Sequence, residues 1–258
     1  MGISISIASG KGGTGKTVLT ANLGVALSEI GKRVIILDAD IEMANLALHL
    51  GLEGTNISLH TVLSGEADIR DAVYEGPSGV KVVPSGMSLD TLIKVDPDRL
   101  GEVLKELLKR VDILLIDAPA GLSKSAVVAL ASAQEVILVV NPEISSLSGA
   151  LKTKIVAGRL GADILGVVVN RADISGGDLN TEEVEILLET KILGLVPEDP
   201  EVGRTAALGT PIVLKSPDSP AAVAVKKLAS DLVQNGYLPE SEDENFSERL
   251  TTDLLREN

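Results

Sequence analysis

The chain has 258 residues and a formal net charge of −14, and 45% of its residues are hydrophobic although aromatic residues make up only 1%. A field of that sign repels nucleic acid and anionic lipid. The absence of cysteine excludes a disulfide scaffold, a Cys-ligated zinc site and a Cys-ligated iron–sulfur cluster. There is no secretory signal pattern, and no apolar run approaches the roughly 20 residues of a membrane span. We therefore expect a soluble, cytoplasmic protein with a core of Val, Ile, Leu and Ala.

Short apolar runs alternate with longer amphipathic ones along the chain. The runs that predict strands are Ile3–Ala8, Arg33–Leu37, Val80–Val83, Ile113–Ile116, Glu135–Val140, Leu165–Asn170 and Ile192–Val196. Each run is brief and rich in Ile, Val and Leu, which is typical of buried parallel strands. The predicted helices are Gly15–Ile30, Pro97–Arg110 with Asp96 as its cap, Ser146–Leu160, Thr181–Glu189 and Pro220–Asn235.

This alternation predicts an α/β fold, a doubly wound and mainly parallel sheet with helices on both faces. No linker interrupts the chain before Leu238, and the composition becomes acidic after Pro239. We therefore expect two parts, an α/β domain over residues 1–238 and an acidic tail over residues 239–258.

A glycine-rich segment between the first predicted strand and the first predicted helix matches the pattern G-x-x-x-x-G-K-[ST]. Glycines let backbone N–H groups approach phosphate oxygens, and the start of the helix directs its positive dipole end at the anion. Lys16 should reach the β- and γ-phosphates, and the Thr17 hydroxyl should ligate Mg²⁺. The segment therefore predicts Mg-ATP binding by Gly10, Lys11, Gly12, Gly13, Thr14, Gly15, Lys16 and Thr17.

Lys11 directly follows the first glycine, where phosphate binding does not require a lysine. The run Lys11–Thr17 resembles the deviant Walker A motif of the MinD/ParA ATPases, which have the P-loop NTPase fold. The resemblance implies that ATP assembles a sandwich homodimer. In that dimer Lys11 would reach the nucleotide of the other subunit and act as an arginine finger does.

Two further segments strengthen the resemblance. Leu37–Asp40 resembles the family's switch I, which implies that Asp40 orients or activates the attacking water and that Asp38 lies near the metal. Leu114–Gly121 resembles a Walker B strand followed by switch II, with Asp117 at the water shell of the metal. The implied catalytic residues are Lys11, Lys16 and Asp40, and the implied metal-site residues are Thr17, Asp38 and Asp117.

Two segments resemble the family's adenine side. In Val167–Arg171, the Asn170 side chain offers a donor and an acceptor to a base. Gly194–Asp199 resembles the loop that closes over the base. Taken alone, Asn170 could equally be an ordinary Asn in a turn at the end of a strand. Gly194–Asp199 could be an ordinary connection that contains a proline. The resemblance adds Asn170, Pro197, Glu198 and Asp199 to the expected ATP site.

Within the family, Asn45-Leu46, Val139–Glu143 and Gly209–Val213 are similar to the MinD branch. That likeness implies a slow ATPase switch for placing the cell-division site, with an effector or activator protein of cell division as partner. A ParA-like ATPase for DNA partitioning or cargo positioning stays open, although the net charge disfavours nucleic acid. A metabolic P-loop ligase or kinase is a third reading, which Lys11 disfavours because it points to a symmetric partner.

The acidic tail has an apolar pattern of its own. Phe246, Leu250 and Leu254 recur at a spacing of four, which would place them on one face of a helix. MinD-like proteins bind membrane through such a helix with a basic flank, but here acidic residues outnumber Arg249 and Arg256. Two interpretations stay open: a weak anchor on the inner face of the cell membrane, strengthened by dimerisation, and a disordered tail whose short helix binds a protein.

Overall fold

The structure is a computed structural model that describes residues 2–40, 43–86, 98–172 and 181–238. Within these residues, eight strands form one sheet in the order β3-β4-β2-β5-β1-β6-β7-β8. All neighbouring strands are parallel except β3 and β4. The strands are β1 (Ile3–Ala8), β2 (Val34–Asp38), β3 (Tyr74–Glu75), β4 (Lys81–Val83), β5 (Ile113–Asp117), β6 (Glu135–Val140), β7 (Asp163–Ala172) and β8 (Ile192–Pro197).

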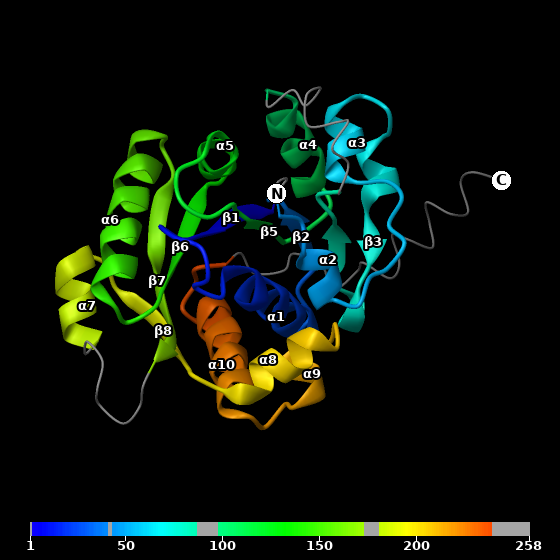
Figure 1. The fold of residues 1–258 in the computed structure, drawn as a ribbon. Coiled ribbons are helices and arrows are strands. Elements are labelled where there is room, and N and C mark those ends of the chain that lie inside the picture. Colours follow the sequence, from blue (N-terminus) through cyan, green and yellow to red (C-terminus); the bar gives the residue numbers. More distant parts are fainter. Residues whose placement is uncertain (1, 41–42, 87–97, 173–180, 239–258) are drawn as a thin grey trace.

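Helices cover both faces of the sheet (Figure 1), so the predicted doubly wound, mainly parallel fold is confirmed. One face is covered by α1 (Lys16–Glu29), α2 (Leu46–His49), α8 (Pro200–Ala207), α9 (Ile212–Lys215) and α10 (Pro220–Gln234). The other face is covered by α3 (Leu59–Leu63), the 3-10 turn η1 (Ile69–Ala72), α4 (Asp98–Leu108), α5 (Lys124–Ala131), α6 (Ile144–Arg159) and α7 (Thr181–Leu188). A second 3-10 turn, η2 (Pro77–Gly79), lies between β3 and β4.

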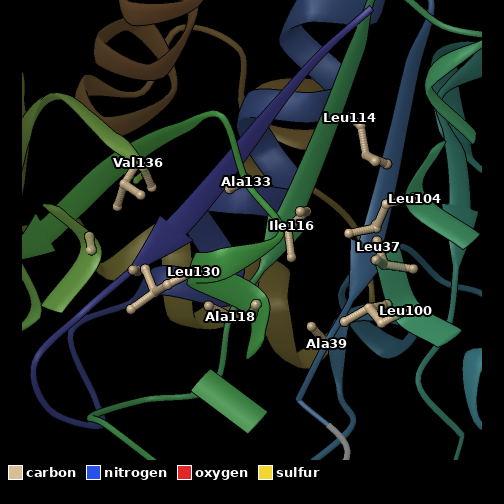
Figure 2. Close-up of a cluster of buried hydrophobic side chains, with 14 of the residues drawn as sticks. Leu37, Ala39, Leu100, Leu104, Leu114, Ile116, Ala118, Leu130, Ala133 and Val136 are labelled. Atoms are coloured by element: carbon tan, nitrogen blue, oxygen red, sulfur yellow. The ribbon is translucent and has the colours of Figure 1, made fainter. Parts of the chain in front are cut away.

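The core is divided by the sheet into two clusters. In β2, Ile35 and Leu37 face one cluster, while Val34 and Ile36 face the other, as the two-residue period of a strand requires. Figure 2 shows side chains of β2 and β5 packing against Leu104 of α4. Because both faces are covered, these strands read as continuous apolar runs in the sequence.

The predicted strands are all present, and their bounds shift by a few residues. The edge strand β3 was missed because it contains only two residues. Also missed were α2, α3, α5, α8 and α9, which have four to eight residues each. The predicted cap Asp96, the first helical residue Pro97 and the acidic tail lie outside the described residues. None of the helices in the described part of the chain combines the length and apolar character needed to cross a membrane.

A candidate nucleotide site at the carboxyl edge of the sheet

The predicted site residues follow strands that end at one edge of the sheet. The glycine-rich segment follows β1, Asp38 ends β2, Asp117 ends β5, and Asn170 lies near the end of β7. Parallel strands bring their carboxyl ends to the same edge, which is where ligands bind in open α/β sheets. The fold therefore gathers residues that are up to 160 positions apart in the sequence, from Gly10 to Asn170.

The loop before α1 has the backbone that a phosphate cradle needs. Gly13 and Gly15 have φ values of 78° and 84°, in the left-handed region that favours glycine. A Cβ added at Gly12 or Gly13 would meet nothing within 4 Å, so the loop is open on this side. No side chain caps the start of α1, which leaves its first N–H groups available to an anion.

The two outer glycines of the segment have a different reason to be glycine. A Cβ on Gly10 would lie 1.9 Å from the backbone carbon of Gly149 in α6, so the loop and α6 meet backbone to backbone. A Cβ on Gly15 would lie 2.2 Å from Nδ2 of Asn170. These positions are therefore fixed by contacts within the protein as well as by any ligand.

Asp38 and Asp117 are direct neighbours in the register of β2 and β5, and each is only 1% exposed. Burial and the charge of Asp117 raise the pKa of Asp38 well above its usual value. Burial also raises the pKa of Asp117, although Lys16 and hydrogen bonds from Thr17 and Thr20 lower it in part. The Lys16 ammonium lies 3.8 Å from Oδ1 of Asp117, to which the Thr20 hydroxyl donates at 3.2 Å.

This arrangement fits a magnesium ion. Two neighbouring buried carboxylates are costly without a cation, and Oδ2 of Asp117 has no hydrogen-bond partner among the described residues. The Thr17 hydroxyl acts on the same carboxylate and lowers its pKa. Carboxylate and hydroxyl oxygens with room for water are the ligands that Mg²⁺ takes. Both oxygens of Asp38 already accept backbone N–H groups, from Asp40 at 3.0 Å and Leu46 at 3.3 Å.

Asp40 lies at the rim of this site, just after β2. Its Oδ1 accepts a hydrogen bond from the backbone N–H of Met43 at 3.0 Å, and its own N–H donates to Asp38. The side chain is half-buried. The structure thus places Asp40 beside the paired carboxylates.

Lys11 has partners that the sequence did not predict. Its ammonium forms an ion pair with Glu143 and donates to Oγ of Ser145 at 3.1 Å, both at the start of α6 in the same chain. The Lys11 side chain is 35% exposed, whereas that of Lys16 is 8% exposed. One sequence signal could have identified Glu143 as a partner of Lys11. Glu143 follows β6, and parallel strands bring their carboxyl ends to the same edge of the sheet.

On the other side of the loop lies a cavity of about 280 Å³, lined by Gly15, Asn170, Arg171, Pro197, Glu198 and Asp199 and by apolar side chains of α1, α8 and α10. Nδ2 of Asn170 donates to the carbonyl of Thr14 at 2.7 Å. This bond uses one of the two N–H groups on Nδ2, so the other N–H and the Oδ1 acceptor stay available to a base. Arg171 forms an ion pair with Glu198 at 3.6 Å, next to the cavity.

Asp199, in the wall of this cavity, hydrogen-bonds to the start of two helices. One carboxylate oxygen accepts the N–H of Glu201 at 2.9 Å and caps α8, and the other accepts the N–H of Ala221 at 3.2 Å at the start of α10. Asp199 therefore joins two helices at the edge of the cavity, and its oxygens are already engaged before a base arrives.

A glycine-rich loop between a strand and a helix, a buried lysine, and a Walker B carboxylate together define a P-loop nucleotide-binding protein. Residues 5–212 match the CobQ/CobB/MinD/ParA nucleotide binding domain, and the chain belongs to this family. It is 52% identical over 237 residues to an uncharacterised ATP-binding protein of Methanocaldococcus jannaschii, covering 92% of this chain and 90% of that protein.

Two solved structures are similar over most of the chain. One is the septum site-determining protein MinD of Pyrococcus horikoshii complexed with Mg-ADP, with 43% identity, a TM-score of 0.86, and coverage of 90% of this chain and 96% of that one. The other is MinD in the MinC:MinD cell division protein complex of Aquifex aeolicus, with 32% identity, a TM-score of 0.81, and coverage of 90% and 96%. The family is one of ATPases, and ATP and Mg²⁺ are the cofactors of this chain.

Proposed function

We propose that this protein is an Mg-ATP-dependent dimerisation switch with slow ATP hydrolysis. The observation that carries the proposal is that two lysines of one loop differ in burial and in partner. Lys16 is buried beside Asp117 in its own site, whereas Lys11 lies at the surface of the same loop, paired with Glu143. A surface cation beside a phosphate cradle is placed to serve the nucleotide of a second copy.

Exposed apolar side chains at the same edge support a second copy as the partner. Met43, Leu122 and Ile144 follow β2, β5 and β6, and they are 71%, 41% and 76% exposed. Exposed apolar side chains grouped at one edge are typical of an interface. They would be covered when two nucleotide faces meet, which offsets part of the repulsion between two chains of charge −14.

Within the proposed site, Lys16 and the N–H groups at the start of α1 bind the phosphates. Thr17, Asp38 and Asp117 hold Mg²⁺ and its water shell, and Asp40 orients the attacking water at the rim. When bound, Mg²⁺ supplies positive charge that offsets the charge developing on the phosphoryl oxygens. Lys11 of the other subunit completes this compensation, so hydrolysis is slow until a dimer forms.

The cavity beside Asn170 favours adenine as the base. With one N–H of Nδ2 engaged by Thr14, the side chain still presents Oδ1 and a second N–H, an acceptor and a donor that match the amino group and a ring nitrogen of adenine. The apolar side chains around it fit the faces of a planar ring.

For the cellular role we propose placement of the cell-division site, with an effector or activator protein as partner. This rests on the names of the similar proteins, a septum site-determining protein and a MinC:MinD complex. The alternative, DNA partitioning or cargo positioning, would use the same ATP site. In either role residues 1–238 would form the ATPase domain and residues 239–258 the tail.

The switch is tested by the dependence of ATPase activity on protein concentration. If the dimer is the active form, turnover per chain rises as the chain is concentrated, whereas Lys11→Ala stays low at every concentration. The matched control is Lys152→Ala, an exposed lysine of α6. Turnover per chain that is constant over a hundredfold range of protein concentration contradicts the proposal.

The cellular role is tested with the ATP-loaded Asp40→Ala form. We expect this form to retain a cell-division protein from the native cell extract and to leave DNA unshifted in gels at moderate salt. A DNA shift that requires ATP would favour the partitioning alternative.

A further inference from the structure

A second cavity, of about 430 Å³, lies at the edge of the sheet opposite the nucleotide site. Its lining includes Val34, Lys81 and Val111, which lie at or within two residues of the first residues of β2, β4 and β5. The cavity lies on the face covered by α4, which supplies Leu107 to its wall. Figure 1 shows α4 on the β3 side of the sheet, away from α6 and α7.

The cavity concentrates positive charge in an acidic protein. Its lining has five basic side chains and two acidic ones, a net charge of +3, within a chain of net charge −14. The basic residues are Lys32, Arg33, Arg70, Lys81 and Arg110. Ile35, Ile69 and Leu107 form an apolar floor beneath them. The cavity therefore suits an occupant that has carboxylates together with apolar side chains.

Local acids neutralise this rim only in part. Arg70 pairs with Asp68, and Arg110 pairs with Glu106, yet their side chains are 62% and 52% exposed. Arg33 pairs with Asp112 at 2.6 Å, and its side chain is 33% exposed. Lys81 is exposed and forms no ion pair with any described residue. Arg110 follows the last turn of α4, where a cation compensates the helix dipole. That explanation does not extend to Lys81, which lies in strand β4.

The chain itself carries the complementary charge. Residues 239–258 contain seven acidic and two basic side chains, a net charge of −5, and they also include Phe246. The described chain ends at Leu238, and Lys191, just before β8, lies 3.8 Å from the ring centre of Tyr237. The first residues of β8 lie at the amino edge of the sheet, so the described chain ends at the edge that holds the cavity.

The tail is also long enough to reach it. Twenty residues extend over ~66 Å at ~3.3 Å per residue. The eight strands span ~34 Å between the two outer strands, at ~4.8 Å per step. The tail can therefore pass around the amino edge to the face of α4 with residues to spare.

We propose that this cavity binds the chain's own acidic tail, with tail carboxylates against Arg70, Lys81 and Arg110. Docking there would hold the apolar residues of the tail at the edge opposite the nucleotide site, away from a membrane or a second protein. The contacts are between exposed charges, so salt weakens them. The proposal does not depend on the ATP-driven switch.

The test is zero-length carbodiimide coupling of the full chain at low ionic strength, read by mass spectrometry. We expect Lys81 to couple to acidic residues of the tail far more than Lys152, an exposed lysine of α6. The double variant Arg70→Ala with Arg110→Ala should reduce this coupling severalfold, and Arg204→Ala on α8 should not. The variant E240Q/E242Q/D243N/E244Q changes only the tail and should reduce it as well.

Equal numbers of ¹⁵N-labelled and unlabelled chains identify whose tail is bound. Coupling within one chain supports the proposal, and coupling between labelled and unlabelled chains overturns it in favour of a second copy. Coupling of Lys81 to the tail at no more than the level of Lys152 also overturns it. So does coupling that 1 M salt leaves unchanged.

Discussion

The ammonium of Lys11 is held by the carboxylate of Glu143 in its own chain, at the point where α6 begins. Backbone contact between Gly10 and Gly149 fixes α6 against the same loop. The residue proposed to serve a second copy therefore starts from an internal ion pair, which must open before Lys11 can cross to another subunit. The pair thus opposes dimerisation by a small amount.

Glu143→Gln should make dimerisation easier, because it removes the charge that holds Lys11. Exposed ion pairs contribute about 0.2–1 kcal/mol each, and a dimer opens two of them, so the protein concentration for half-dimerisation with ATP should fall by about two- to thirtyfold. Sedimentation equilibrium measures this. Glu201→Gln, which breaks the pair with Arg204 on α8, is the matched control. Weaker dimerisation of Glu143→Gln would mean that this carboxylate supports the dimer.

Asp117→Asn should stabilise the protein when nucleotide and Mg²⁺ are absent. It removes the like charge beside Asp38, keeps an oxygen for the Thr20 hydroxyl, and places an amide at the position of the unpartnered Oδ2. We expect a gain of about 1 kcal/mol in the free energy of unfolding, measured by urea denaturation near pH 7. The same variant should lose the stabilisation that Mg-ATP gives the parent. A less stable metal-free variant would show that the paired carboxylates do not strain the fold.

Gly10→Ala and Gly12→Ala should separate the packing of the loop against α6 from its binding of Mg-ATP. The Cβ of the first meets the backbone of Gly149, which should cost about 1–3 kcal/mol of stability in thermal or urea unfolding. The Cβ of the second meets nothing within 4 Å, so stability should change little while calorimetry shows weaker Mg-ATP binding. Equal losses of stability in the two variants would refute this division.

Asp112 gives the fold an acid-sensitive contact at the start of β5. Burial alone would raise its pKa, but hydrogen bonds and charge from Arg33 outweigh burial and lower the pKa below 3.8. A lowered pKa means that the stability from this group is present above about pH 4 and is lost as pH falls through the lowered value. Asp112→Asn should cost about 2 kcal/mol at pH 7 and flatten the pH dependence of stability below pH 4. An unchanged acid profile would rule this out.

The sheet was predictable because its strands are buried on both faces and therefore appear as continuous apolar runs. The phosphate loop was predictable because its residues are consecutive. The internal partners of Lys11 were not, since Glu143 is 132 residues away and only the meeting of β1 and β6 brings it close. The bond from Asn170 to Thr14 likewise depends on β7 reaching the loop across the sheet. The cationic cavity could not be predicted either, because its basic residues come from separate elements.

The most direct test of the switch is light scattering on Asp40→Ala, which should bind ATP and hydrolyse it far more slowly than the parent. We expect a dimer with Mg-ATP and a monomer with Mg-ADP or without nucleotide. Adding Lys11→Ala should abolish the dimer, while adding Lys152→Ala should leave it intact. A dimer that persists without nucleotide, or that forms with ATP in the absence of Lys11, would contradict the account.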